Sequence, residues 1–470
     1  RLCRQGKHAE AAKICQSLQS SPSHRVQAAA LRGLIQASPS KQVSMIVAGL
    51  AAEEPWKRAV AADCLVSTDK PEQIQAVAAA VPGLPAPGKI AAFVVLKHRS
   101  HAAIRQAALK SLDAPQSEVR AAALASLIKS ASAEDVARLA TLAATCKDET
   151  VRKAALETMR LMTAKGTNAA ILVAMSDEKT LTPDLVRCAL GRRSLEFTPG
   201  FLKAAVSPNE AVRLEAFQAL ETMATEKDAP ALVALLSKTP PGNQREAAGR
   251  AVWLCCSKIA DPAKRPIPLL EVMKTADAAG QCAILPSLAR LGGNQSLAAV
   301  HAAMKSDNKE VRDAGYRALA NWPDASVADE LLEVAKNAEI PEYRIWALRA
   351  YARVVSLPSD RPPQKTFDML TAAMKLAARP EDKQLIVSRL SAVRVPQALA
   401  LLVSYLDDPQ LSAAAVPAVF TLAKGLSQSH PQEAKAALEK VQPMTKDPAV
   451  VQQIPKVLRD IEAREKGKKK

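Results

Sequence analysis

The sequence predicts an all-α protein, a right-handed α-solenoid of about 14 stacked helix pairs. A short motif returns at intervals of roughly 33 residues, a period within the range of 20–50 residues that solenoid repeats occupy. Alanine, the best helix former, supplies 92 of the 470 residues. Aromatic residues make up only 3% of the chain, which argues against an all-β sandwich or barrel. The period and the composition together indicate helices that stack on their neighbours.

The repeated motif is a short polar or proline-containing turn, followed by Val-Arg or a similar pair and then by an alanine-rich segment. Ten weaker copies lie between Arg25 and Val451. Because these copies are spread over the whole chain, the repeats are expected to organise all of it. The four clear copies occupy residues 117–124, 148–156, 209–216 and 307–314.

Residues 133–163 show what one period contains. Their apolar residues fall into two segments, 133–143 and 151–162, and both segments recur at the 3.6-residue period of a helix. Asp148 lies between the segments, where its carboxylate is placed to cap the second helix and suits the helix dipole. A single pair of such helices cannot bury its apolar faces alone, so the neighbouring pairs must supply the core.

Length and hydropathy limit the class of protein further. A chain of 470 residues exceeds the size, ~250–300 residues, at which one compact core stops growing. No run of about 18 apolar residues is present, so no membrane-spanning helix is expected. We expect one continuous repeat array over residues 1–461, followed by a basic tail or linker over residues 462–470. Because the first residue is Arg1 and not Met, we expect the chain to begin inside a longer precursor.

The net charge of +17 suggests an anionic partner such as nucleic acid. Its distribution argues against that class, because the first fifty and last twenty residues together contribute +10 of the +17. A solenoid that binds nucleic acid should repeat basic residues along one face, with aromatic residues for stacking. Here the basic charge and the aromatic residues concentrate in different parts of the sequence.

Five of the 14 aromatic residues fall within residues 316–351, and the block of residues 301–350 has a net charge of −2. A surface built from these side chains would suit a protein or a sugar better than phosphate groups. The alternative is that the rings fill the core of two repeats. The candidate partner-binding residues are Trp322, Tyr343, Trp346 and Tyr351.

The sequence offers no catalytic or metal-binding constellation. His98 and His101 have a spacing that two metal ligands can share, but no third ligand matches it, so we expect solvated histidines in a turn. The eight cysteines form no Cys-x-x-Cys pair, and most lie among apolar residues, where free cysteine packs as a small apolar side chain. We therefore expect no enzyme activity, no metal and no cofactor.

A recurrent arginine stands at the start of the second helix of many repeats. In a stacked array these side chains should align along one edge, close to Asp or Asn residues of the turns. One interpretation is a structural ladder of ion pairs and hydrogen bonds between repeats, and the other is a basic stripe for an acidic partner. The ladder consists of Arg120, Arg152, Arg187, Arg213, Arg245, Arg312 and Arg344.

Two helices per repeat, a turn with Asp or Asn, and then Val-Arg and Ala-Ala-x-x-Ala-Leu resemble the HEAT repeats of the armadillo-like group. The resemblance covers nearly the whole chain, is specific in the four clear copies, and implies about 14 HEAT-like helix pairs. It also implies a structural role for the arginine ladder. Tetratricopeptide repeats rank second, because residues 6–12 share some of their character but their Trp, Gly and Tyr spacing is missing from the middle of the chain.

Residues 270–425 carry a narrower resemblance, through the runs 319–325, 328–332 and 344–351. They resemble HEAT arrays of large secreted bacterial proteins that also contain a 3-keto-disaccharide hydrolase domain. This resemblance implies a context, not an activity, and a periplasmic or exported location. The scattered cysteines favour instead a reducing compartment such as the cytoplasm.

These observations predict a non-enzymatic protein-interaction scaffold, a HEAT-repeat module of a larger bacterial protein that binds a partner along its concave face. One alternative is a nucleic-acid-binding HEAT-like solenoid, including a HEAT-like DNA glycosylase. Another is an accessory module of a carbohydrate-processing protein of the 3-keto-disaccharide hydrolase type. Protein is the expected class of partner, nucleic acid comes second, and the sequence leaves the oligomeric state open.

Overall fold

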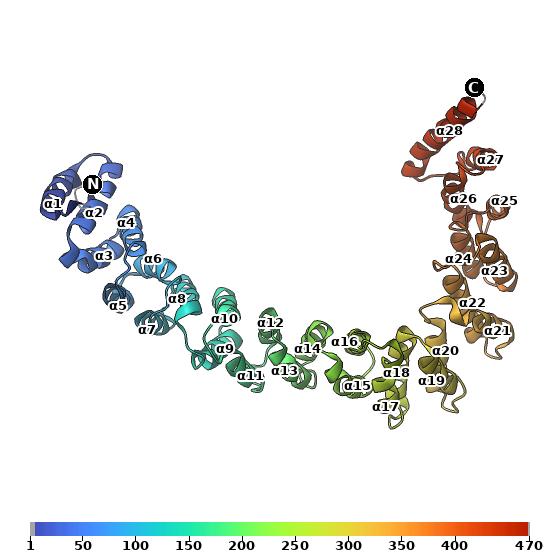
Figure 1. The fold of residues 1–470 in the computed structure, drawn as a ribbon, viewed down its shortest axis with the longest axis horizontal. Helices are drawn as coiled ribbons and strands as arrows, with labels where there is room; N and C mark the ends of the chain where they lie inside the picture. Colours follow the sequence, from blue (N-terminus) through green and yellow to red (C-terminus); the bar gives the residue numbers. More distant parts are fainter. Residues whose placement is uncertain (1–4, 469–470) are drawn as a thin grey trace. The chain divides into compact units, whose positions relative to one another are not determined.

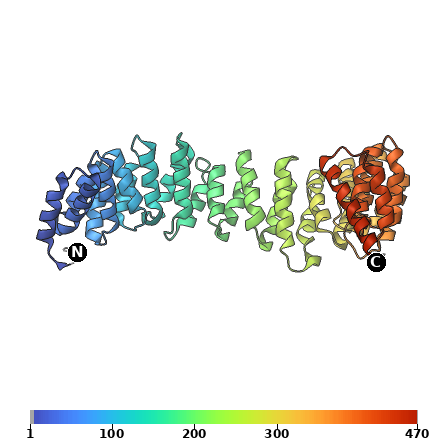
Figure 2. The same cartoon turned by 90° about the horizontal axis from the view of Figure 1, so that it is seen from above.

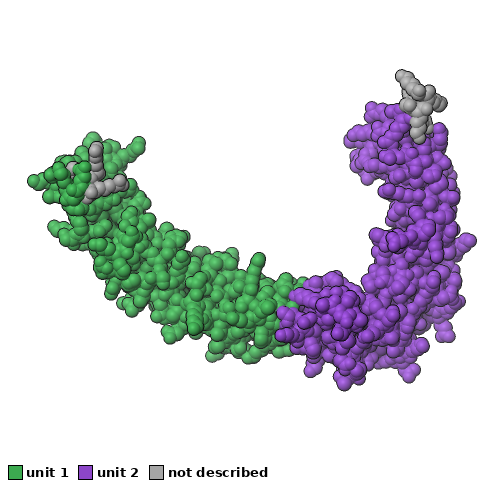
Figure 3. All heavy atoms as spheres, viewed as in Figure 1, with its two compact units in different colours: residues 1–224 green, residues 225–470 purple. Residues whose placement is uncertain are grey.

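The computed structural model describes residues 5–468, and within this range every regular element is a helix (Figure 1). The described helices are α1–α28, joined by short turns and by brief 3-10 helices. The predicted all-α solenoid of about 14 helix pairs is therefore confirmed. The chain forms two compact units, residues 1–224 (unit 1) and residues 225–470 (unit 2), which Figure 3 distinguishes by colour.

In unit 1 the odd-numbered helices form one layer and the even-numbered helices form the other (Figure 1). We call these the first and second helices of each pair. Every second helix from α2 to α14 packs against the next second helix along its layer. The bounds are α1 (His8–Ser17), η2 (Leu18–Ser20), α2 (His24–Ala37), η3 (Pro39–Lys41), α3 (Gln42–Ala51), α4 (Pro55–Val66), α5 (Pro71–Ala80), η4 (Val81–Gly83), α6 (Ala86–Leu96), α7 (Ala102–Ser111), α8 (Ser117–Ser130), α9 (Asp135–Thr145), α10 (Glu149–Leu161), α11 (Thr167–Met175), α12 (Pro183–Gly191), η5 (Leu195–Phe197), α13 (Thr198–Ala204) and α14 (Glu210–Met223).

Unit 2 repeats the same two-layer arrangement, and its second helices contact one another in order from α16 to α28. Figure 2 shows the helices of each unit standing side by side, with their axes across the direction of the array. The bounds are η6 (Glu226–Asp228), α15 (Ala229–Lys238), α16 (Asn243–Ser257), η7 (Pro262–Lys264), α17 (Ile267–Met273), α18 (Ala278–Leu291), α19 (Asn294–Met304), α20 (Lys309–Ala320), η8 (Ala325–Val327), α21 (Ala328–Asn337), α22 (Pro341–Val355), α23 (Pro363–Leu376), α24 (Pro380–Leu390), α25 (Pro396–Ser404), η9 (Tyr405–Asp407), α26 (Ser412–Leu426), α27 (Pro431–Val441) and α28 (Pro448–Lys468).

The valine of the repeated motif is a core residue in all four clear copies. Val119, Val151 and Val212 are fully buried, and Val311 is 3% exposed. Full burial of a valine side chain stabilises the fold by roughly 1.5–3 kcal/mol. The motif therefore recurs because each pair needs an apolar anchor in the first turn of its second helix, directly before the arginine that contacts the turn.

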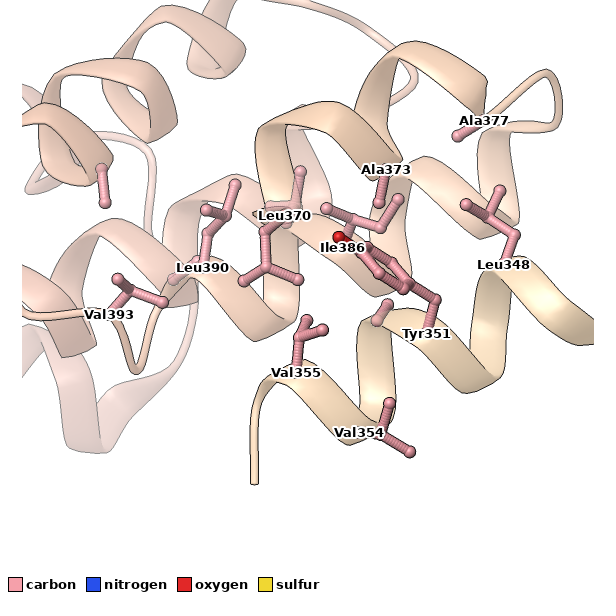
Figure 4. Packing of buried hydrophobic residues seen from close by; sticks show 14 of the residues in the cluster. Leu348, Tyr351, Val354, Val355, Leu370, Ala373, Ala377, Ile386, Leu390 and Val393 are labelled. Atoms are coloured by element: carbon pink, nitrogen blue, oxygen red, sulfur yellow. The ribbon is translucent and has the colours of Figure 1, made fainter. Parts of the chain in front are cut away.

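The hydrophobic core is continuous from one helix pair to the next and is not gathered around a single centre. In Figure 4, Tyr351 of α22 lies among Leu370 of α23 and Ile386 and Leu390 of α24, so one cluster joins two successive pairs. All four side chains are at most 1% exposed. This continuity is the expected property of a solenoid, in which each repeat is stabilised by its neighbours.

Turn residues begin the second helices as predicted. The Asp148 carboxylate accepts hydrogen bonds from the backbone N–H groups of Thr150 (2.9 Å) and Val151 (3.2 Å), so the predicted cap of α10 is confirmed. A hydrogen bond from the Ser117 side chain and the bond from Val151 hold the pKa of Asp148 below its ordinary value. Asn209 caps α14 in the same way.

The predicted basic tail or linker over residues 462–470 begins within α28. The helical backbone of α28 continues through residues 462–468. Lys469 and Lys470 lie outside the described residues. None of the helices within residues 5–468 combines the length and the apolar character that crossing a membrane requires.

Candidate partner-binding surface

Five of the seven ladder arginines hold their own turns together. Each donates from its guanidinium to the backbone carbonyl six residues earlier, at or just beyond the end of the preceding first helix. We call this contact the turn staple. Its members are Arg152 to Cys146 (3.2 Å), Arg213 to Ser207 (2.7 Å), Arg245 to Thr239 (2.8 Å), Arg312 to Ser306 (2.7 Å) and Arg344 to Ala338.

The turn staple has a simple physical reason. The last carbonyl groups of a helix have no partner within that helix, and an arginine can bond to them. An arginine in the first turn of the next helix lies directly over these carbonyls. Arg58 makes the same contact with Ala52 at 2.8 Å, at a copy of the motif that is weak in the sequence.

Two ladder arginines, Arg120 and Arg187, form ion pairs with acidic residues of the kind that the sequence suggested. Arg120 lies 3.6 Å from Asp148 of the next pair. Arg187 bonds to Asp184 of its own helix at 2.5 Å and to Glu215 of the next pair at 2.9 Å. The expected contact between repeats is therefore present at Arg120 and Arg187. At the other five positions the structure shows the turn staple, which is a contact within one pair.

A second set of arginines caps the helix of the preceding pair, and the sequence analysis missed it. The Arg192 guanidinium donates to the carbonyls of Met159, Arg160 and Met162 at the end of α10, at 2.6, 2.9 and 3.0 Å. Arg99 does the same at the end of α4. The recurring separation of 30–34 residues between donor and acceptor, close to one repeat, is the signal that could have indicated these contacts.

Three of the four candidate aromatic residues belong to the core. Trp322 and Tyr351 are each 1% exposed and Tyr343 is 4% exposed, so a partner cannot contact them without unfolding the repeats. The Trp322 indole N–H donates to the Ser326 hydroxyl at 3.1 Å. This corrects the prediction of an aromatic binding surface, and it supports the alternative that these rings fill the core.

Trp346 is the exception, because it is only half-buried and faces a guanidinium. The central carbon of the Arg317 guanidinium lies 4.3 Å from the centre of the Trp346 ring. A similar contact joins Arg290 and Trp253 at 3.7 Å. A cation over an indole face at such a distance is attracted by roughly 0.5–1 kcal/mol at an exposed site. The structure therefore brings tryptophan and positive charge together on the second helices of unit 2.

One arginine stands in the last turn of each of four consecutive second helices, α18, α20, α22 and α24. Within the described part of the chain, no carboxylate oxygen lies within 4.0 Å of any of the four guanidinium groups. Three are exposed, and the fourth, Arg353, is half-buried. We call this set, Arg290, Arg317, Arg353 and Arg389, the arginine row.

The arginine row borders a hollow of about 350 Å³ between α20, α22 and α24. Trp346 and Arg349 line it beside Arg317, Arg353 and Arg389. Burial, followed by the charge of Arg389, lowers the pKa of Arg353 from its usual value. The hollow is thus open, basic and partly aromatic, a composition that suits an anionic side chain.

Arg349 differs from the row because it already has a carboxylate. Its Nε lies 2.6 Å from Asp382, which is 2% exposed and also lies 3.9 Å from Arg379. This buried carboxylate ties α22 to α24. Arg349 therefore holds the wall of the hollow in place.

A hollow of about 970 Å³ is lined by residues of α15 and α17, of the turns that follow them, and of the first turns of α16 and α18. Its acidic residues already have local partners. Glu271 pairs with Lys274 at 2.7 Å, and Asp277 accepts the Gly280 N–H at 2.8 Å at the start of α18. These contacts are structural, so we assign this hollow no chemistry.

The histidines and cysteines do not gather into a site. His101 caps α7 by accepting the Ala103 N–H at 3.1 Å, whereas His98 lies in the preceding turn. Burial raises the pKa of the Cys188 and Cys256 thiols to about 12 and that of Cys255 to about 11. No three potential metal ligands come together among residues 5–468, and Cys3 lies outside that range.

The described residues form an all-α solenoid of stacked helix pairs, and its fold resembles that of HEAT-repeat solenoids. A family model described as HEAT repeats matches residues 267–352, which include the first two members of the arginine row. The karyopherin Kap121p bound to the SUMO protease Ulp1p has a TM-score of 0.52 at 11% identity, over 96% of this chain and 56% of that chain. Importin beta has a TM-score of 0.48 at 14% identity, over 95% of this chain and 72% of that chain. At such identities the likeness concerns the fold alone, and this chain spans about half the length of Kap121p. No curated protein matches.

Proposed function

We propose that the chain is a non-enzymatic protein-interaction scaffold that binds its partner along the second-helix layer. The observation that carries this proposal is the arginine row with its adjoining hollow, because the four guanidinium groups of the row have no carboxylate within 4.0 Å among the described residues. Solenoids present extended surfaces to which each repeat contributes a few side chains. The crystal structure of Kap121p contains a bound protein, the SUMO protease Ulp1p, which agrees with this class of function.

Capture of a partner by the whole chain tests the proposal. The immobilised chain is incubated with an extract of its own cells, with and without nuclease, and the retained partner is then purified. We expect one defined protein that is retained after nuclease treatment and that slows amide hydrogen exchange in second helices but not in first helices. Protection confined to first helices, or loss of all binding after nuclease, would contradict the proposal.

A nucleic-acid-binding solenoid is the second candidate, and one observation favours it. Trp253 and Trp346 lie beside arginines on the second helices, although the sequence suggested that aromatic residues and positive charge were separated. Labelled single-stranded and double-stranded DNA at 50 mM salt test this candidate directly. Tight binding that weakens steeply with salt would support it.

Two further expectations from the resemblance remain proposals. One is a role as an accessory module of a carbohydrate-processing protein, which the sequence of the intact gene tests. The other is a periplasmic or exported location, with the cytoplasm as the alternative, and cell fractionation tests it.

A further inference from the structure

We propose that the arginine row binds an extended acidic segment of a protein partner, whose carboxylate side chains are three residues apart and which crosses α18, α20, α22 and α24 in turn. This inference rests on the proposed function as a scaffold. It specifies the chemistry of the partner segment, its conformation and the order in which it crosses the helices. The segment crosses the second helices with one carboxylate for each member of the row.

The spacing of the helices sets the spacing of the carboxylates. Packed helices lie ~8–10 Å apart, so successive members of the row are separated by about that distance along the layer. A segment in the polyproline II conformation rises ~3.1 Å per residue and has three residues per turn. Every third side chain therefore points to the same side at intervals of ~9 Å. In a β-strand, by contrast, side chains three residues apart point to opposite faces.

Two members of the row are held in place before any partner arrives. The Arg290 and Arg317 guanidinium groups lie over the rings of Trp253 and Trp346. A guanidinium that is already oriented loses less conformational entropy when it binds a carboxylate.

A third member, Arg353, is fixed by backbone groups. Its guanidinium donates to the carbonyls of Ala320 (3.1 Å) and Trp322 (2.6 Å). An arginine has five N–H donors, so donors remain for a bound carboxylate. Arg389 is exposed beside it and lines the same hollow.

The row also has a purely structural explanation, which accounts for only part of it. A basic residue in the last turn of a helix is favoured by the helix dipole. That effect explains one arginine per helix, but it does not explain why none of the four has a carboxylate within 4.0 Å among the described residues. In unit 1, Arg160 occupies the last turn of α10 and pairs with Glu157 of the same helix at 2.5 Å.

Tryptophan beside arginine keeps nucleic acid as the second candidate, but the stacking geometry of these contacts leaves less room for a base than for a carboxylate. Base stacking requires a free aromatic face, and one face of each ring is already covered by a guanidinium. Tyr343 lies 5.5 Å from the Trp346 ring in a tilted arrangement, which crowds that ring further. A carboxylate needs only the edge of the guanidinium, which can donate two parallel hydrogen bonds to it.

Fluorescence anisotropy with the whole chain and two labelled peptides tests the proposal. The first, which we call the spaced peptide, consists of four Glu-Pro-Pro units in a row. The second, the block peptide, has the same composition but places all four glutamates before the eight prolines. Both carry the same charge, but only the spaced peptide has a carboxylate at every third residue. We expect the spaced peptide to bind at least about fivefold more tightly at 50 mM salt, and both affinities to fall as salt rises.

Variants of the row supply the residue-level test. The double change Arg317→Ala with Arg389→Ala should weaken binding of the spaced peptide by about 25-fold, if each partly exposed pair contributes near ~1 kcal/mol. Lys at both positions should restore part of the affinity, because it keeps the charge but loses the paired donors. The matched control, Lys365→Ala with Lys375→Ala, removes two positive charges from the first helix α23 and should change binding less than twofold.

Three results would overturn the proposal. Equal affinity for the two peptides would show that only net charge matters. Full binding by the double alanine variant, with a helical circular dichroism spectrum that matches the wild type, would place the contact elsewhere. Tighter binding of a twelve-nucleotide single strand, lost in the same variant, would assign the row to nucleic acid. If the captured partner binds the variant as well as it binds the wild type, this inference fails while the scaffold function stands.

Discussion

Some surface arginines of the second helices have different partners in the two units. In unit 1, Arg32 bonds to Asp63 of the next second helix, and Arg160 bonds to Glu157. In unit 2, Arg290 and Arg317 lie on tryptophan rings instead. Both units use the same repeat and the same residue type, so the neighbouring side chain alone decides whether an arginine is neutralised or left available for a partner.

The largest expected effect concerns the buried carboxylate that each unit contains. Asp135 accepts two hydrogen bonds from Arg105, at 2.7 and 2.8 Å, and Asp382 bonds to Arg349. Asp135→Ala or Asp382→Ala removes the charged hydrogen bonds that the buried carboxylate accepts and should lower the local free energy of unfolding by about 3 kcal/mol. Hydrogen exchange should accelerate around the changed pair only, because repeats are stabilised by their neighbours. A loss below about 1 kcal/mol at either site would mean that the carboxylate is dispensable.

High pH should destabilise unit 2 more than unit 1. Burial raises the pKa of Cys188 in unit 1 and of Cys255 and Cys256 in unit 2 above the ordinary 9.0, to about 12, 11 and 12. Unfolded thiols therefore lose their protons first, and stability falls as the pH rises above about 9. The loss is about 1 kcal/mol per thiol between pH 9 and 10.

Urea unfolding at pH 8 and pH 10 measures this effect. The Cys255→Ala, Cys256→Ala variant should lose less stability between the two pH values than the wild type loses. Cys188→Ala should show a smaller change of the same sign. Identical pH dependence in all three proteins would contradict the burial of these thiols.

The arginines that cap a neighbouring helix should matter somewhat less. Arg192 makes three carbonyl contacts in unit 1 and Arg353 makes two in unit 2. Arg192→Ala should cost about 2 kcal/mol and Arg353→Ala about 1 kcal/mol, given the modest net value of each hydrogen bond. Exchange of the last-turn amides of α10 and α20 reports each loss separately. Equal effects would show that the number of carbonyl contacts does not set the stability.

The smallest expected effect on stability distinguishes an ion-paired surface arginine from one that lies on a tryptophan ring. Arg160→Ala removes an exposed ion pair, and Arg317→Ala removes a contact with an indole ring, so each should cost about 0.5 kcal/mol in low salt. In 1 M salt the Arg160 effect should vanish, because salt screens exposed charges. The Arg317 effect should persist in part, since the side chain also packs on the ring. Thermal melts in both salts, with Arg317→Lys as the control, measure the difference.

The repeat period, the helix pairs and the cap at Asp148 could be predicted because each depends on residues that are near in sequence. The burial of the motif valines follows from the same local pattern. The turn staple has a fixed spacing of six residues and was in principle visible, but acidic turn residues suggested a different partner. We expected ion pairs because opposite charges attract. The backbone carbonyls at the end of the preceding helix have no partner within that helix, and they lie closer to the guanidinium than the acidic side chains do.

The arginine row could not be predicted from a charge count. The acidic residues that give residues 301–350 a net charge of −2 are spread over the turns and both layers of helices, so the total does not show where the arginines of the second helices lie. Trp322 and Trp346 are 24 residues apart and look alike in the sequence, yet one is core and the other is half exposed. Which side of a helix faces the stack depends on the position of the neighbouring pairs.

The turn staple has a consequence for how such a chain can change its length. Each staple joins residues six positions apart, so a duplication or deletion of one complete pair would carry the staple with it and leave every turn intact. The caps by Arg99, Arg192 and Arg353 join successive pairs, so they would be interrupted at the new junction. Insertions of whole repeats should therefore be tolerated best where no such cap crosses the boundary.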